Sequence, residues 1–183
     1  EVNNLSKIKY AKVTSFESID EFHSFFPMEI ISTKEENINY FKSINKEFYL
    51  FPEYRQYPIR MIDYLPKRWI FDNKTINGLN DNVSKGEYYT FQVGFLSPYK
   101  DVDDIDIIFS DLKSSSNIKI DKSNFTCFNK GGIDLDGKFF NKKISVKKGK
   151  VQALWFGLNI PPKIKKGTYY SYLLIKPKDN VQD

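Results

Sequence analysis

The chain has 183 residues, of which 40% are hydrophobic and 16% aromatic, so it is long enough for one domain with a sizeable packed core. Its net charge of +5 comes from 28 basic residues that are nearly all lysines interleaved with 23 acids, which is not the pattern of a typical nucleic-acid binder. No apolar run is long enough to span a membrane, and a single cysteine, Cys127, excludes an internal disulfide.

Lysines are densest in one run, residues 142–150. Such a run is typical of a solvated face or of a sheet edge, where lysines discourage pairing with other chains. A nucleic-acid patch is the alternative that charge alone leaves open. The composition favours the solvated edge, and we expect no nucleic-acid partner.

Helix signals are confined to the first 46 residues. Residues 18–21 fit a capping box and predict a short helix over residues 22–26, which would end before Pro27. Residues 32–35 repeat the capping signal and predict a second helix. The expected apolar face of this second helix consists of Ile38, Phe41 and Ile44.

Prolines punctuate the next stretch and exclude a long helix. Residues 48–51 form a short apolar run that Pro52 is expected to close. Residues 51–69 contain three prolines, and we expect this segment to lie across a sheet or along its edge.

All three arginines of the chain, Arg55, Arg60 and Arg68, lie in this proline-punctuated segment, where Trp69 follows them. A guanidinium is planar and offers several donors, so its confinement to one segment marks places where an ammonium group would serve less well. We expect ion pairs that pin the segment to the β-sandwich predicted below or to a neighbouring domain. A site for a sugar or a carboxylate is the alternative. Trp69 is expected to pack rather than to form a platform for a sugar ring. These four residues are the candidate interdomain or ligand contacts.

From residue 73 the chain reads as successive strands separated by turns. Alternating apolar side chains predict a half-buried strand in residues 87–96. Its expected inward face consists of Tyr89, Phe91, Val93 and Phe95. Asp136-Gly137 is a strong hairpin-turn signal. Further strands are expected at residues 105–109, 118–120, 125–128 and 144–146.

Residues 151–160 are apolar on both faces, which predicts a central strand that is covered on both sides. Pro161 and Pro162 would end it, because proline cannot donate to the ladder, and Gly167 would begin a return strand over residues 168–176. We expect this hairpin to close a sheet. The spacing of the strands predicts a mainly β fold, an antiparallel, jelly-roll-like β-sandwich with one or two short N-terminal helices. The sandwich is expected as a single domain over residues 1–183, with a helix-containing segment 1–46 and sandwich strands in 47–183.

Motifs of several common enzyme classes are missing, including the Walker loop, the dinucleotide-binding glycine fingerprint, HExxH and paired CxxC motifs. An acidic cluster at residues 101–106 lacks the spacing of an EF-hand, and a solvated loop is preferred to a calcium site. Residues 134–137 are likewise better explained by a hairpin turn. Cys127 is expected to be a buried structural thiol, because His23 is the only histidine. We expect no metal and no cofactor.

Several stretches together carry a resemblance to a known family. They are PMEIIST, FPEYRQYPIRM, LPKRW, GEYYTFQVGFLSP, FSDLK, CFNKGGIDLDGKFF and VQALWFGLNIPPKIKKGTYYSYLLIKP. The chain resembles, over nearly its whole length, the N-terminal β-sandwich of proteins related to glycoside hydrolase family 123, often uncharacterised secreted proteins of Bacteroides-type gut bacteria. The strand GEYYTFQVGF and the pair VQALWFGLNIP…GTY are its most specific parts. It departs from the family at Tyr170-Ser171, where a small residue, often glycine, is expected after the tyrosine.

In that family the sandwich precedes a (β/α)8 barrel, and an adjacent Asp-Glu pair in the barrel performs substrate-assisted cleavage of N-acetyl-β-galactosaminides. The resemblance therefore implies a non-catalytic accessory domain whose partner is a catalytic (β/α)8 domain after residue 183 of a parent chain. No catalytic residue transfers to this chain. A secreted, periplasmic or outer-surface location is also implied.

Two other functions remain as hypotheses. An autonomous carbohydrate-binding module is the main alternative, since the chain has 12 tyrosines and Trp69, whose rings can stack on sugars. A small enzyme or a basic nucleic-acid binder is the third.

Overall fold

The computed structural model describes residues 30–59, 63–71 and 78–178. The helix predicted over residues 22–26 lies outside these ranges. Within them the helices are α1 (Lys34–Ser43) and α2 (Lys67–Phe71). The strands are β1 (Tyr49–Tyr54), β2 (Tyr88–Ser97), β3 (Ile105–Phe109), β4 (Leu112–Ser114), β5 (Lys119–Ile120), β6 (Phe125–Cys127), β7 (Gly131–Ile133), β8 (Phe139–Asn141), β9 (Lys150–Asn159), β10 (Tyr169–Tyr170) and β11 (Leu173–Pro177).

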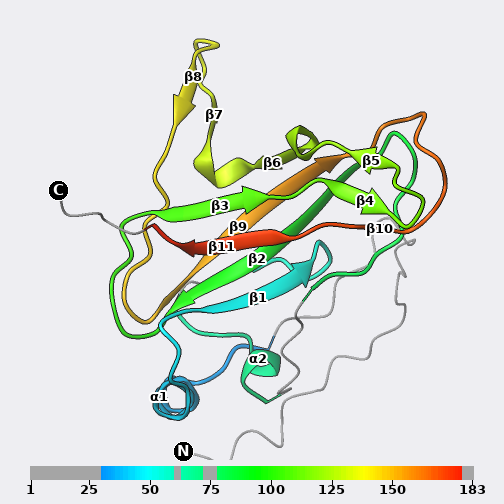
Figure 1. The fold of residues 1–183 in the computed structure, drawn as a ribbon. Coiled ribbons are helices and arrows are strands. Elements are labelled where there is room, and N and C mark those ends of the chain that lie inside the picture. The colour runs from blue at the N-terminus through cyan, green and yellow to red at the C-terminus, as the bar shows by residue number, and fades with distance from the viewer. Residues whose placement is uncertain (1–29, 60–62, 72–77, 179–183) are drawn as a thin grey trace, which may run out of the picture.

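The strands form two facing layers, which confirms the predicted mainly β, antiparallel fold (Figure 1). One layer is a four-stranded sheet in the order β1–β2–β9–β6. The other consists of β11 paired with β3 and, farther along, of β4 between β10 and β5. All of these pairs are antiparallel. The β7–β8 hairpin projects away from both layers (Figure 1).

The main core fills the space between the two layers. Buried side chains from β2 and β9 on one side meet those from β3 and β11 on the other: Val93, Phe95, Leu154, Phe156, Ile105 and Ile175. Val102, Ile144 and Val146 complete this cluster. The rings of Phe91 and Phe156 stack with centroids 5.2 Å apart, and Phe109 meets Phe156 edge-on at 5.8 Å. Aromatic pairs of this kind contribute about 0.5–1.5 kcal/mol each beyond their buried area. The predicted inward face of residues 87–96 is therefore confirmed.

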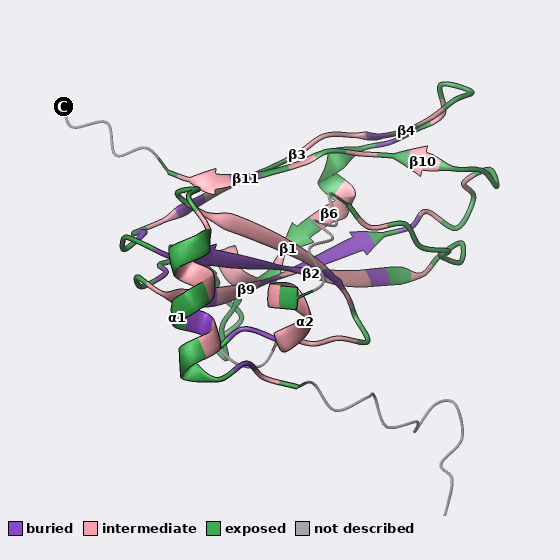
Figure 2. Cartoon of the chain, turned by 90° about the horizontal axis from the view of Figure 1, so that it is seen from below, coloured by how far each residue is buried: buried purple, intermediate pink, exposed green. Residues whose placement is uncertain are grey.

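Strand β2 is covered on both faces over much of its length, so the prediction of a half-buried strand is wrong. Gln92 and Leu96 point away from the main core and are nevertheless fully buried. The Gln92 side chain accepts a hydrogen bond from the N–H of Ile59 (2.9 Å) and donates to the C=O of Tyr57 (2.7 Å). Helices α1 and α2 lie on this side of the sheet (Figure 2). Alternation within one strand cannot reveal a cover that comes from distant parts of the chain.

The chain changes layer after β9, so the predicted hairpin of residues 151–176 is wrong. Strand β9 is central, as predicted, between β2 and β6, but β10 pairs with β4 and β11 pairs with β3. The connection through residues 160–168 carries the chain across to the opposite layer, a distance of about 10 Å in a sandwich. Leu173 and Ile175 then contribute to the core from that layer.

Strand β1 continues through Pro52 to Tyr54, although Pro52 was expected to end it. In the four-stranded sheet β1 is an edge strand, and Pro52 lies opposite Val93. Edge strands tolerate proline where the missing N–H would face away from the sheet. The strand predicted at residues 144–146 is reduced to one bridge between Val102 and Val146. The strands predicted at 105–109, 118–120 and 125–128 are confirmed as β3, β5 and β6.

Helix α1 is capped one residue later than predicted. Thr33, rather than Ser32, is the N-cap, and its hydroxyl accepts a hydrogen bond from the N–H of Glu36 (3.2 Å). The Glu36 carboxylate accepts in turn from the N–H of Thr33 (2.8 Å), which completes a capping box.

The inward face of α1 also differs from the prediction. Phe41 and Ile44 pack against the cluster under the sheet, but Ile38 is exposed. Its place is taken by Asn37, a buried residue whose side-chain oxygen accepts from the N–H of Leu65 (3.1 Å). Apolar periodicity could not find this residue because it is polar. In the described part of the chain, neither helix has the length and apolar character needed to cross a membrane.

Candidate functional site

Arg68 and Trp69 lie in α2, which closes over the edge strand β1. The Trp69 ring stacks on Phe51 with centroids 4.2 Å apart and planes 2° apart. Its indole N–H donates to the Glu53 carboxylate, and Nη1 of Arg68 lies 2.5 Å from the same oxygen. Glu53 is only 3% exposed, so its charge depends on these donors. The ion pair and the stacked ring pin α2 to the sheet.

Arg55 has a different carboxylate partner. Its Nη1 lies 3.1 Å from Glu87 Oε1, and its guanidinium carbon lies 5.6 Å from the centre of the Tyr89 ring. Arg60 lies outside the described residues. Arg55 and Arg68 therefore do not converge on a shared carboxylate. A role of Arg55, Arg60, Arg68 and Trp69 as interdomain or ligand contacts stays a prediction.

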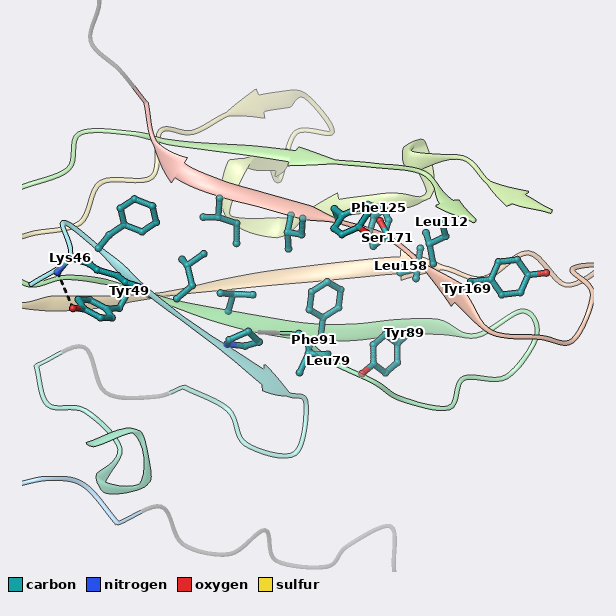
Figure 3. A pocket seen from close by; sticks show the side chains of 18 of the residues that line it. Lys46, Tyr49, Leu79, Tyr89, Phe91, Leu112, Phe125, Leu158, Tyr169 and Ser171 are labelled. Atoms are coloured by element: carbon teal, nitrogen blue, oxygen red, sulfur yellow. Dashed lines mark hydrogen bonds between the residues drawn. The ribbon is translucent and has the colours of Figure 1, made fainter. Parts of the chain in front are cut away.

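A groove of about 660 Å³ runs between the two layers, where the edge strand β1 faces β11 (Figure 3). Its walls are mostly apolar and include Phe91, Leu112, Phe125 and Leu158. Two tyrosine hydroxyls at the groove already have partners: Tyr89 donates to Asp81 (2.8 Å) and Tyr169 donates to the C=O of Lys165 (2.9 Å). Burial and the hydrogen bond to Asp81 raise the pKa of Tyr89. The groove therefore suits an apolar ligand group or side chain better than a hydroxyl-rich sugar.

Carboxylates in the described segments tie loops together. Asp104 Oδ1 accepts from the N–H of Ile105 (2.9 Å), from the N–H of Ile144 (3.0 Å) and from Lys130 Nζ (3.0 Å). Burial opposes ionisation of Asp104, but these hydrogen bonds hold its pKa below the ordinary value. The acidic cluster at residues 101–106 is thus not only a solvated loop. No group of three or more His, Cys, Asp or Glu among the described residues could hold a metal ion.

The direction of the pKa shifts bears on catalysis. Within the part of the chain that the structure describes, the pKa is lowered for the carboxyl groups of Glu36, Asp101, Asp104, Asp111 and Asp121. A general acid for glycoside cleavage needs the opposite, a raised pKa that keeps the proton available near neutral pH. These five groups are therefore suited to ion pairing and not to proton donation.

Cys127 is partly buried in β6 and packs against the main core. Burial raises the pKa of its thiol, although hydrogen bonds from the backbone of Asn129 and Lys130 oppose the shift. A thiol that stays protonated at neutral pH is a poor nucleophile. The environment agrees with the structural role that the sequence predicts.

The β7–β8 hairpin carries the most exposed apolar side chains of the described chain. We name residues 131–141 the apolar arm (Figure 1). Leu135 at its tip is completely exposed, Phe139 is 87% exposed and Ile133 is 60% exposed. Ile133 and Phe139 lie opposite each other in the ladder, so they share one face of the ribbon. In the described ranges the two strands of the arm pair only with each other.

The turn and the base fix the conformation of the apolar arm. Asp134 Oδ1 accepts from the N–H of Asp136 (3.0 Å), and Gly137 N–H donates to the C=O of Asp134 (3.1 Å), which confirms the predicted hairpin turn. At the base, a Cβ at Gly131 would lie 2.1 Å from the carbonyl oxygen of Phe140, so only glycine fits. An isolated two-stranded hairpin is marginally stable in water. An ordered hairpin with one apolar face is therefore an element that suits burial against another surface.

A second exposed cluster lies around β10 and the residues that lead into β11, and one of its members, Tyr172, also borders the groove between the layers. Tyr170 and Tyr172 border an open groove of about 500 Å³. Lys113 and Lys122 line the same groove. Neither this cluster nor the apolar arm was among the candidates that the sequence indicated, because exposed and buried apolar residues look alike in a strand pattern.

No protein-family profile matches the chain, and no curated protein matches it either. Among solved structures, the chain is similar to a family 123 glycoside hydrolase from Clostridium perfringens, a structure described as giving the details of glycolipid glycan hydrolysis. The two chains are 16% identical and superpose with a TM-score of 0.48. The similarity covers 74% of this chain and 25% of that enzyme, so this chain spans well under two thirds of its neighbour's length.

Proposed function

We propose that this chain is a non-catalytic accessory domain of a protein related to glycoside hydrolase family 123. It packs against and supports a downstream catalytic (β/α)8 domain that acts on glycans containing N-acetylhexosaminides. The observation that carries the proposal is the apolar arm, an ordered hairpin whose apolar face has no cover among the described residues.

The energetics of the apolar arm support a docking role. Ile133, Leu135 and Phe139 are each more than half exposed. Full burial of such a side chain is worth about 1.5–3 kcal/mol, so an interface formed around the three would be substantially stabilised by them. Hydrogen bonds at its turn and at its base, where the N–H of Lys142 donates to the C=O of Lys130 (2.7 Å), already hold the arm in its hairpin conformation. Less conformational entropy is then lost when the interface forms.

The nature of the partner rests on the resemblance of the sequence stretches to the N-terminal sandwich of that family. A secreted, periplasmic or outer-surface location is part of the same proposal.

An activity assay combined with an arm variant tests the proposal. The 183-residue chain alone should not hydrolyse an aryl N-acetyl-β-galactosaminide, whereas the parent protein should. In the parent protein, Leu135→Ser/Phe139→Ser should lower the unfolding temperature, because serine removes the apolar contact with the catalytic domain. Ile38→Ser is the matched control, since Ile38 is an exposed apolar residue on α1.

The same double substitution should leave the stability of the isolated chain nearly unchanged, because both side chains are solvated there. Hydrolysis by the isolated chain would contradict the non-catalytic role. Equal behaviour of the arm variant and the Ile38 control in the parent protein would contradict docking through the arm.

A further inference from the structure

We infer that the groove bordered by Tyr170 and Tyr172 is a binding site for an acidic glycan, independent of the docking role proposed for the apolar arm. Tyr170 is 67% exposed and Tyr172 is 83% exposed, and both line the groove of about 500 Å³. A tyrosine ring offers an apolar face for the C–H face of a sugar and a hydroxyl for its oxygens. It also loses little conformational entropy on binding, because it has only two side-chain torsions.

The strand opposite these tyrosines contains a β-bulge. Leu173 pairs with Phe109 and Tyr170 pairs with Lys113, so three steps along one strand oppose four steps along the other. The extra residue lies within 110–112, between β3 and β4. A bulge bends its own strand, here residues 110–112, and such bulges occur often beside functional sites.

Serine side chains hold the bulge in place. Ser110 Oγ accepts a hydrogen bond from the N–H of Tyr172 (2.8 Å), and Ser171 Oγ donates to the C=O of Ser110 (2.9 Å). The N–H of Ser110 donates to the C=O of Tyr172 (2.9 Å). The backbone that carries Tyr172 is therefore fixed before any ligand binds.

The charges in the groove favour an anionic ligand. Asp111 is the acid there, and its carboxylate already binds Lys119 Nζ (2.9 Å) and the N–H of Lys122 (2.9 Å). The hydrogen bond from Lys119 holds the pKa of Asp111 below its ordinary value. The ammonium groups of Lys113 and Lys122, in contrast, make no ion pair with any residue in the described ranges. Two cations thus line the groove, whereas its lining carboxylate is ion-paired with Lys119, which also lies 3.4 Å from Asp121.

The composition of the groove favours a sugar over a protein surface. Lysine, aspartate and serine are depleted in the buried centre of protein interfaces, yet they make up most of this lining. Exposed aromatic rings next to hydroxyls and cations match a ligand with alternating apolar faces, hydroxyls and acidic groups. An oligosaccharide that carries carboxylates or sulfates has this chemistry.

Titration of the 183-residue chain with a chondroitin sulfate hexasaccharide tests the site, with neutral chitohexaose as the comparison ligand. We expect the acidic chain to bind, more weakly as salt is added, and the neutral chain to bind far less. Tyr172→Ala should weaken binding by about tenfold, the loss expected for a solvent-exposed stacking ring. Lys113→Gln/Lys122→Gln should weaken it and flatten its salt dependence.

The matched control is Lys34→Gln/Lys42→Gln, which removes the same charge from α1 and leaves the groove intact. The inference would be overturned if this control weakened binding as much as the groove variant, since the attraction would then be a property of net charge. Equal binding of the neutral hexasaccharide, or no binding of the acidic one, would also overturn it. A third result would overturn it as well: Tyr172→Ala abolishes self-association of the chain but leaves glycan binding unchanged. The groove would then be occupied by a second copy of the chain.

Discussion

Substitution of Gly94 by alanine tests whether Trp69 is a fixed packing residue. A Cβ at Gly94 would lie 2.6 Å from Trp69 Cη2 and 3.2 Å from Ile59 Cδ1. The tryptophan cannot simply turn away, because its ring is stacked on Phe51 and its N–H is bound to Glu53. Overpacking of this kind costs about 1–3 kcal/mol. We expect Gly94→Ala to lower the free energy of unfolding by about 2 kcal/mol, measured by urea denaturation followed by circular dichroism.

Gly157 supplies a matched control in the neighbouring strand β9. A Cβ there would lie 2.4 Å from the ring of Tyr88, an even closer approach. Tyr88, however, is 46% exposed and can rotate toward solvent. We expect Gly157→Ala to change the free energy of unfolding by no more than about 0.5 kcal/mol. Equal losses in the two variants, or no loss in Gly94→Ala, would refute the account of Trp69 as fixed and would leave its ring free to serve as a sugar platform.

Three further variants probe other parts of the structure. Glu53→Ala removes a buried carboxylate that binds Arg68 and Trp69. It should lower the free energy of unfolding by about 3 kcal/mol in urea denaturation. This is the lower end for a broken buried pair, because the Arg68 side chain is 30% exposed. Because the pKa of Asp104 is lowered in the folded state, its ionised carboxylate stabilises the fold at any pH above the ordinary carboxyl pKa of about 4. This stability is lost as the pH falls through the lower folded-state pKa. Asp104→Asn should therefore be less stable than the unsubstituted chain at neutral pH and lose less stability in acid. Gly131→Ala should speed hydrogen exchange in β8 without changing global stability, since its Cβ would collide with the Phe140 carbonyl at the base of the arm; unchanged exchange would show that the base tolerates a side chain.

The sequence indicated the parts of the fold that local patterns determine. The inward face of β2 followed from strict alternation, and the central position of β9 followed from apolar residues on both of its faces. The turn at Asp136-Gly137 followed from its dipeptide. In each case the information lies within about ten residues of chain.

The errors concern contacts between distant segments. Pro161-Pro162 signals that β9 ends, but it carries no information about which layer the chain enters next, and the expected hairpin is a crossing between layers. The cover over Gln92 comes from residues more than 30 positions away. Ion pairs of Arg55 and Arg68 were expected, but their separate carboxylate partners were not readable from spacing.

The two surface features were missed for a related reason. Ile133 and Phe139 have the composition of a core strand, and only the folded chain shows that their side chains lie outside the core. Tyr170 and Lys113 are 57 residues apart in the sequence and become neighbours only through the β10–β4 ladder. A pattern of exposed aromatic residues next to lysines can be recognised only after the strands are paired.

Hydrogen–deuterium exchange would show whether the apolar arm docks onto a catalytic domain. The exchange of backbone amides in residues 133–139 would be compared between the 183-residue chain and the parent protein that contains it. If the arm is docked, these amides should exchange markedly more slowly in the parent protein, while those of α1 should be unchanged. Identical exchange of the arm in both proteins would show that its apolar face stays in water and would contradict the claim.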